Sequence, residues 1–357
     1  MNDVRNQIIQ GNNPKDEACN FIHITQSLHK KIYIQFRINH PSIPKESLQD
    51  EIFILIVEGF ADKRLWADFV SEKTEVERLR IPKENDENSY CSGKQIIQKI
   101  FSIENMEKYP HNSLVTDIKR NRVVGIIDKD NESFSEITNN SGQNYYKPEK
   151  YKNLFVTETT DTDTFILHYC GFCIFLHLFA DLSSDYSNKK NILFNKILDE
   201  AELLGYIFKA RDDGLLKFKQ LDGESIENFT IAFKQKRPTC EIFKMLMKDN
   251  TNQKKIDGKP WIISKFVRRF IEEKQKPSAR DSENFLSLCR GHSIMQVLCC
   301  HSAKQIKDDF KEDNPEYVLS KKIYEIFHHQ NSVRKSKLFL SLLNWEKQTH
   351  VNFLKRS

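Results

Sequence analysis

The clearest feature of the hydrophobic pattern is a set of three short apolar runs, each followed directly or within a few residues by acids. The runs and their acids are Phe53–Val57 with Glu58, Val123–Ile127 with Asp128 and Asp130, and Leu154–Val156 with Glu158, Asp161 and Asp163. Short runs rich in β-branched residues and bounded by Gly or acids are typical of strands buried in a parallel sheet. The pattern therefore predicts three parallel strands with carboxylates at their carboxyl ends.

Between these runs the apolar residues return at helical spacing. The predicted helices cover residues 60–70, residues 92–103 and a long stretch from about Asp163. Ser92 is the expected N-cap of the second helix. Residues 76–82 are compatible with one more strand, and residues 30–39 (KKIYIQFRIN) with an extended segment. Strands that alternate with helices predict an α/β domain, with a parallel sheet sandwiched by helices.

The pattern divides the chain into three parts. Residues 1–49 form an N-terminal extension, and residues 50–182 form the α/β domain, in which the polar stretch 131–148 is a long loop or an insertion. Residues 183–357 have mostly helical periodicity, with turns at Asp-Gly pairs and Pro277. We expect this mostly α-helical C-terminal region to bind substrate or to mediate dimerisation.

Composition narrows the class of protein only slightly. The net charge of +5 in 357 residues permits a basic nucleic-acid-binding face but does not require one, and the local basic stretches also fit solvated helix faces. The 8 scattered cysteines and the polar start without a signal-peptide core predict reduced thiols in a cytoplasmic protein. The most apolar long run, 166–182, is shorter than a membrane span and is interrupted by polar residues, so we expect no membrane association.

The acids that follow the strands suggest a metal site. Ligands of open α/β sheets bind beyond the carboxyl ends of the strands, where carboxylates from different strands meet. Carboxylates held close together repel one another unless a cation neutralises them, and oxygen ligands suit Mg²⁺ or Mn²⁺. The alternative is an ordinary doubly wound domain whose acids are solvated loop residues or helix caps.

The order of these motifs resembles a known family. Val57-Glu58-Gly59 followed by Asp128-Lys129-Asp130 resembles the Toprim domain, in which a Glu ends one strand and a D-x-D motif follows a later one. The wider series VEGFADKRLW, SGK, VVGIIDKDNE, TETTDTDTFIL and Cys289-Arg290-Gly291-His292 resembles the AriB-type effector nucleases of PARIS anti-phage systems and, more distantly, OLD-type nucleases. The third cluster has Asp161-Thr162-Asp163 where relatives often have D-x-E, and His292 stands where they often have Lys.

The resemblance implies roles for individual residues. Glu58 would be a general base or a metal ligand, and Asp128 and Asp130 would hold the divalent ion. Asp161 and Asp163 would complete the cluster or hold a second ion. The remaining candidates are His292, to supply a proton or a positive charge, and Lys94, Lys129 and Arg290, to contact substrate phosphate. The lysines also fit solvated side chains, and His292 also fits the start of a helix.

By the same resemblance the chain is a metal-dependent nuclease, a toxic effector that cleaves RNA, with tRNA favoured, and that an ATPase partner protein controls. A homodimer is a further expectation. The sequence leaves three alternatives open: a DNA nuclease, a Toprim enzyme of nucleotidyl or strand transfer, and a non-catalytic module that binds nucleic acid or a partner. The mild charge excess does not separate RNA from DNA.

Two other motifs carry less weight. Cys170 and Cys173 form a C-x-x-C pair, but they lie among Phe, Ile and Leu, where free Cys is a common core residue. A structural zinc site would need two further ligands. Ser92-Gly93-Lys94 lacks the upstream Gly of a Walker A loop, so we do not expect this chain to be an ATPase itself.

Overall fold

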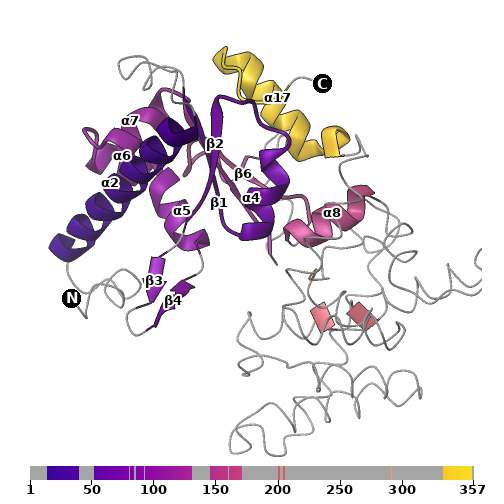
Figure 1. Cartoon of the computed structure of the whole chain (residues 1–357), viewed down its shortest axis with the longest axis horizontal. Helices are drawn as coiled ribbons and strands as arrows, with labels where there is room; N and C mark the ends of the chain where they lie inside the picture. The colour runs from indigo at the N-terminus through magenta and orange to yellow at the C-terminus, as the bar shows by residue number, and fades with distance from the viewer. Residues whose placement is uncertain are drawn as a thin grey trace, which may run out of the picture. The chain divides into compact units, whose positions relative to one another are not determined.

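The computed structural model describes residues 14–39, 52–79, 81–83, 86–91, 93–130, 145–159, 161–170, 200–201, 204–205, 291 and 333–355. The chain divides into two compact units, Met1–Glu158 with Arg334–Ser357, and Thr159–Val333. The elements of the first unit are α2 (Pro14–Asn39), β1 (Phe53–Val57), α4 (Phe60–Ala67), β2 (Thr74–Arg78), β3 (Ile81–Lys83), β4 (Asp86–Cys91), α5 (Lys94–Phe101), α6 (Ile103–Lys108), α7 (Ser113–Lys119), β5 (Val123–Ile127), β6 (Leu154–Val156) and α17 (Lys337–Thr349) (Figure 1). Helix α8 (Thr162–Cys170) lies in the second unit, as do the helical residues 200–201, 204–205 and 291.

A parallel four-stranded sheet organises the first unit. Its strand order is β2-β1-β5-β6, and Val57 pairs with Ile126 while Ile127 pairs with Val156. The three predicted strands are therefore confirmed, and β1 and β5 have the predicted bounds. The expected strand at 76–82 is β2, which begins at Thr74. The antiparallel pair of β3 and β4 was not predicted.

One face of the sheet is covered by α2, α5, α6 and α7 (Figure 1). Every second residue of the central strands points to this face, as the pleat of a strand requires. The core on this side contains Leu28 and Ile32 of α2, Ile97, Ile100 and Phe101 of α5, Met106 of α6, Leu114, Val115 and Ile118 of α7, and Ile54, Ile56, Val123, Ile127, Leu154 and Val156 of the strands. α2 thus shares the core of the sheet, although the sequence predicted residues 1–49 only as an extension.

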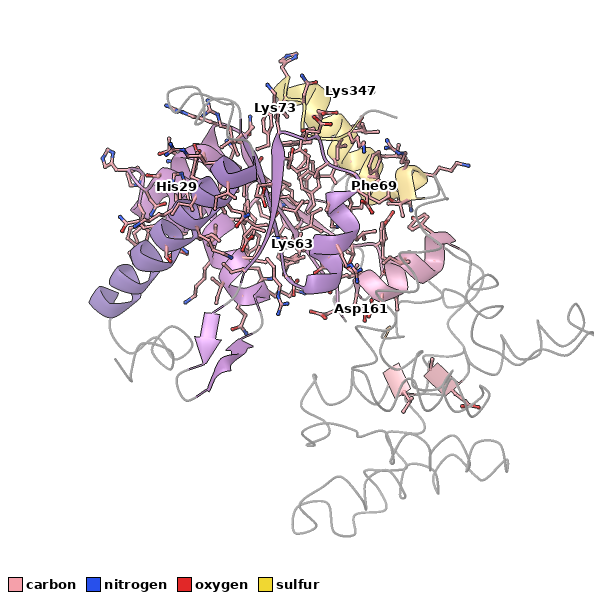
Figure 2. All side chains as sticks on the ribbon, viewed as in Figure 1. His29, Lys63, Phe69, Lys73, Asp161 and Lys347 are labelled. Atoms are coloured by element: carbon pink, nitrogen blue, oxygen red, sulfur yellow. The ribbon has the colours of Figure 1, made fainter. Side chains whose placement is uncertain are left out.

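The opposite face is covered by α4 and by α17, which lies far away in the sequence (Figure 1). The Trp345 ring of α17 packs edge-on against Phe155 of β6 at 6.3 Å between ring centroids. Phe69, which follows α4 and is labelled in Figure 2, packs against Phe339 of α17 at 5.9 Å between ring centroids. Trp345 Nε1 also donates a hydrogen bond of 3.1 Å to Asn153 Oδ1. The two faces together make the predicted α/β sandwich.

The segment after α17 joins the first unit as well. Leu354 forms an antiparallel bridge with Val70, and the Lys355 N–H donates to the Phe69 carbonyl at 2.8 Å. The Glu346 carboxylate accepts from the N–H groups of Phe353 and Leu354 at 2.7 and 3.0 Å. These contacts fix the segment at the edge of the sheet beside β2.

The expectation of an extended segment at residues 30–39 was wrong, because these residues continue helix α2. The β-branched residues of KKIYIQFRIN suggested a strand, yet Leu28 and Ile32 are buried four residues apart while Ile34 and Ile38 are 51% and 66% exposed. His29 and Tyr33 both reach the buried Asp117 of α7, at 2.9 and 3.3 Å. Tertiary packing of one helical face therefore overrides local strand propensity here.

Two details of the second predicted helix also differ. Gly93, not Ser92, is the N-cap of α5, and Ser92 lies outside the described residues. Ile103 does not belong to α5, because α5 ends at Phe101. Ser102 then begins a new helix: its hydroxyl accepts the Asn105 N–H and caps α6. The short helices α6 and α7 were not predicted.

Most of the predicted helical region 183–357 lies outside the described residues, so its character stays a prediction. The same holds for residues 131–144 of the predicted loop. Among the residues described, none of the helices combines the length and the apolar character that crossing a membrane requires.

Candidate metal-binding site at the sheet edge

The carboxyl ends of β1 and β5 meet where the strand order reverses. The connection from β1 leads outward to β2, and the later connection through α5, α6 and α7 returns to β5 on the other side of β1. Such a switch point is the usual ligand-binding crevice of an open α/β sheet. Glu58 follows β1 and Asp128 follows β5, so the register of the strands brings the first two predicted acidic clusters together.

Glu58 and Asp128 are joined directly. Glu58 Oε1 accepts a hydrogen bond of 2.8 Å from the backbone N–H of Asp128. This contact turns the Glu58 side chain across the end of β1 toward β5. The third member of the predicted set, Asp130, lies two residues further on with a left-handed backbone (φ 55°).

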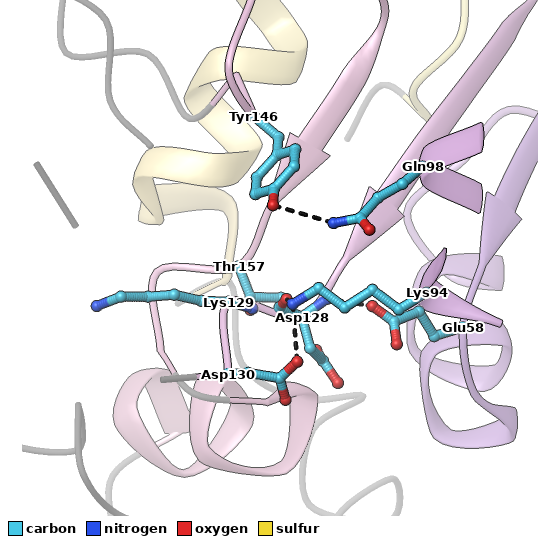
Figure 3. A network of polar contacts seen from close by, with 8 residues as sticks. All are labelled: Glu58, Lys94, Gln98, Asp128, Lys129, Asp130, Tyr146 and Thr157. Carbon is cyan, nitrogen blue, oxygen red and sulfur yellow. Dashed lines mark hydrogen bonds and ion pairs between the residues drawn. The ribbon is translucent and has the colours of Figure 1, made fainter. Parts of the chain in front are cut away.

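Lys94, the first residue of α5, supplies the positive charge of this edge (Figure 3). Its Nζ donates to the Asp128 carbonyl at 2.5 Å and to Asp130 Oδ2 at 2.7 Å. The Lys94 side chain is 13% exposed and that of Asp130 is 48% exposed. The pair therefore lies at the boundary between the core and solvent.

Burial makes the Glu58 carboxylate unusually basic. Loss of solvent raises the pKa of Glu58 to about 8, against the opposing effects of the Lys94 charge and of the hydrogen bond from Asp128. The nearby charges of Asp62 and Asp130 add to the increase. A carboxyl that holds its proton near neutral pH is a common property of acid–base and metal-binding sites.

Asp62 is a residue of this site that sequence reasoning missed. It lies in the first turn of α4, is buried, and accepts the Gly59 N–H at 2.6 Å. Its distance of four residues from Glu58 in VEGFAD was the available signal. The hydrogen bond fixes the turn between β1 and α4, and with it the position of Glu58.

Lys129 is oriented differently from the other candidates. Its N–H donates to Thr157 Oγ1 at 3.1 Å, which ties the end of β5 to the end of β6. Figure 3 shows its side chain directed away from Glu58, Lys94 and Asp130. Among the described residues, Lys94 is therefore the predicted lysine that reaches the acidic edge.

Glu158, the first acid of the third cluster, contacts a helix instead. Its Oε1 accepts from the backbone N–H groups of Lys337 and Leu338, the latter at 3.3 Å. These are the first residues of α17, where the helix dipole favours a negative charge. Glu158 thus anchors α17 to the end of β6.

The remaining acids of the third cluster belong to the second unit. Asp161 caps α8: its Oδ1 accepts the Thr164 N–H at 2.8 Å, and its Oδ2 accepts the Gly291 N–H at 2.9 Å. A Cβ on Gly291 would come within 2.1 Å of the Asp163 Cβ, so the chain can approach this closely only with glycine. Gly291 and the third acidic cluster, 130 residues apart in the sequence, therefore lie in contact. Arg290 and His292 lie outside the described residues.

The donor set at the sheet edge suits a hard divalent cation. Glu58, Asp128 and Asp130 offer carboxylate oxygens, which Mg²⁺ and Mn²⁺ prefer. Within the described part of the chain, however, no three acidic, His or Cys side chains are grouped closely enough to hold an ion as they stand. Two contacts that occupy groups of this site run from the Asp128 N–H to Glu58 and from Lys94 to Asp130.

A network behind the site fixes α5. Gln98 Nε2 donates to the Tyr146 hydroxyl at 3.0 Å, and Tyr146 is buried just before β6 (Figure 3). Because Lys94 lies one turn before Gln98, this contact holds the start of α5 beside the ends of β5 and β6.

Comparison of the chain with protein-family models, curated proteins and solved structures gave no match.

Proposed function

We propose that this protein is a divalent-metal-dependent nuclease with a Toprim-like fold, and that it hydrolyses phosphodiester bonds at the edge formed by β1 and β5. The observation that carries the proposal is the meeting of Glu58, Asp128, Asp130 and Lys94 at the switch point of the sheet. These residues come from three separate segments, and the sequence pattern independently predicts that the three acids share one site.

Asp128 and Asp130 are the proposed ligands of Mg²⁺ or Mn²⁺, with Glu58 as a third ligand or as the general base beside the ion. When bound, the ion would supply Lewis-acid stabilisation of the charge that develops on the phosphoryl group. Asp130 is half exposed and can meet an ion that arrives from solvent. By family resemblance, Asp161, Asp163, Arg290 and His292 stay proposed functional residues, the two aspartates as further metal ligands or as ligands of a second ion.

Glu58 is the proposed proton acceptor. Its pKa, raised to about 8 by burial, gives it the basicity that a general base needs near neutral pH. Metal at the neighbouring aspartates would favour the ionised form, because an adjacent positive charge lowers the pKa of a carboxyl. The hydrogen bond from the Asp128 N–H keeps its side chain at the edge during this change.

The family resemblance also suggests a substrate, a cellular role and a partner protein. RNA, with tRNA favoured, is the proposed substrate, DNA is the alternative, and the cell's defence against phage is the proposed setting, with an ATPase as the controlling partner. The role in defence rests on the resemblance of the motif series from residue 57 to residue 292.

The test is a cleavage assay with the purified chain. Mixed RNA and DNA substrates are incubated with Mg²⁺, with Mn²⁺ and with a chelator, and the products are separated on denaturing gels. We expect cleavage of RNA that requires metal and falls at least about 100-fold in Glu58→Gln and Asp128→Asn, in line with the loss of a catalytic acid–base or metal-ligand group.

Glu149→Gln is the matched control, because Glu149 is exposed in a turn before β6 and belongs to none of the three acidic clusters. It should cleave as the wild type does. Equal cleavage by Glu58→Gln and the wild type would contradict the proposal. Joined or extended strands among the products would favour the transferase alternative, and binding without any cleavage would favour the non-catalytic module.

A further inference from the structure

The ammonium of Lys94 is already paired with oxygens of the protein, unlike that of a lysine exposed to contact substrate phosphate. Its ammonium contacts two oxygens of the segment that follows β5, the Asp128 carbonyl and the Asp130 carboxylate. Its charge also acts on Glu58. With 13% of its side chain exposed, Lys94 is largely removed from water and depends on these oxygens for its hydrogen bonds.

The contacts of Lys94 explain why the carboxylates do not form a ready cation site. Asp130 is held by Lys94, and Glu58 is held by the Asp128 N–H, so the oxygens of the two side chains face different partners. The ammonium provides what a bound cation would provide: one positive charge among Glu58, Asp128 and Asp130, which reduces their mutual repulsion.

We propose that Lys94 is an internal cation that occupies the place of a divalent ion at Asp130, and that metal binding has to displace it. This inference rests on the proposed function, because it assigns a state of the same site. Displacement frees the Asp130 carboxylate as a ligand and leaves the ammonium at the start of α5, beside the site. Lys94 is accordingly a positioning residue that sets the metal affinity of the site.

The length and attachment of Lys94 make such an exchange feasible. The lysine side chain has four rotatable bonds, so its ammonium can leave Asp130 while the backbone of α5 stays in place. The buried residues Ile97, Ile100 and Phe101, together with the contact from Gln98 to Tyr146, hold that backbone. Asp130 is half exposed and can turn toward solvent with little loss of packing.

The test measures metal affinity, without reference to cleavage. Binding of Mn²⁺ alone is followed by isothermal titration calorimetry for the wild type, Lys94→Met and Lys94→Gln, with circular dichroism to check folding. We expect both variants to bind Mn²⁺ about three- to tenfold more tightly, because a partly buried ion pair no longer has to be broken. In chelator, both variants should melt at a lower temperature than the wild type, because the carboxylates have lost their neutralising charge.

An Asp130→Asn background separates displacement from simple charge repulsion. Without the Asp130 charge there is no ion pair to break, so Lys94→Met should change the affinity for Mn²⁺ by a smaller factor there than in the wild type. An equal factor in both backgrounds would overturn displacement. Lys99→Met, on the same helix but in its last turn, should leave the affinity unchanged.

The possible failures are distinguishable. If the wild type binds Mn²⁺ and loses this binding in Asp128→Asn, but the folded Lys94 variants bind no more tightly than the wild type, only the role of Lys94 is overturned. If neither the wild type nor the Lys94 variants bind Mn²⁺, the metal site of the proposed function and the role of Lys94 are overturned together.

Discussion

The carboxylate of Glu58 accepts the backbone N–H of Asp128 at 2.8 Å, across 70 residues of sequence. The contact joins the ends of β1 and β5, the two central strands of the sheet. Because the donor is a main-chain group, its position depends on the register of the strands and not on a side-chain rotamer. The edge of the sheet therefore fixes Glu58 in place before any ligand arrives.

The basicity of Glu58 predicts how the stability of the metal-free protein depends on pH. The folded state keeps the Glu58 proton up to a pKa of about 8, whereas the unfolded chain releases it near the ordinary value of 4.5. The folded state therefore binds more protons between these values, and the free energy of unfolding should fall as pH rises through this window. We expect a loss on the order of 2–4 kcal/mol, measured by urea denaturation in chelator at several pH values.

Glu58→Gln is the control for this effect. Its side chain does not titrate and can still accept the Asp128 N–H, so the fall in stability over the same window should be largely absent. A wild-type protein that becomes more stable from pH 5 to pH 8 in chelator would contradict a raised Glu58 pKa.

The two carboxylate oxygens of Asp161 accept different N–H groups, so substitutions can remove one hydrogen bond or both. Asp161→Asn keeps an oxygen for the Thr164 N–H but loses the acceptor for the Gly291 N–H, whereas Asp161→Ala loses both. We expect melting temperatures in the order wild type, Asp161→Asn, Asp161→Ala, with the loss of the helix cap worth about 1 kcal/mol. Differential scanning calorimetry measures the order, and equal stabilities of the two variants would argue against the capping role.

The packing of α17 predicts a large effect of a residue far from the acidic edge. Trp345 is 3% exposed, and its ring packs against Phe155 and Phe353. Trp345→Ala should reduce the free energy of unfolding by about 3–5 kcal/mol, the usual range for deleting a buried aromatic side chain. Lys347→Ala, on the exposed side of the same helix, should change it by less than about 0.5 kcal/mol. Urea denaturation followed by tryptophan-independent circular dichroism compares the two variants.

Gly125, in the middle of β5, leaves no room for a side chain. A Cβ there would lie 2.7 Å from both Leu154 Cδ1 and Phe101 Cε2. Gly125→Ala should therefore destabilise the protein by about 1–3 kcal/mol through overpacking. Addition of Phe101→Leu should recover part of this loss, since it removes one of the two clashing groups. Strictly additive effects of the two substitutions in denaturation experiments would contradict the clash.

The sequence predicted a strand best where every one of its residues is apolar or Gly and buried. Val123–Ile127 is buried along its whole length, and such a run leaves few alternatives to a central strand. The antiparallel pair of β3 and β4 could not be predicted in this way, because IPK and DENSYC contain few apolar residues. Helix α2 was misassigned because its partners, Asp117 among them, lie 84 to 88 residues away.

The candidate site was predictable only where it follows from the pairing of the strands. Glu58, Asp128 and Asp130 could be grouped because adjacent parallel strands bring their carboxyl ends together. Glu158 had the same sequence context, yet it contacts the start of α17, 179 residues later. Local sequence patterns place an acid at the end of a strand, but they do not show which distant segment will donate hydrogen bonds to its carboxylate.

The return of α17 to the sheet also bears on how the protein is made. The strands of the sheet are synthesised well before residues 337–354, so the part of the sheet face that α17 covers stays exposed while the intervening residues are made. Exposed apolar surface of this kind favours aggregation and engagement by chaperones. Packing of this part of the sheet must therefore await the synthesis of residues 337–354.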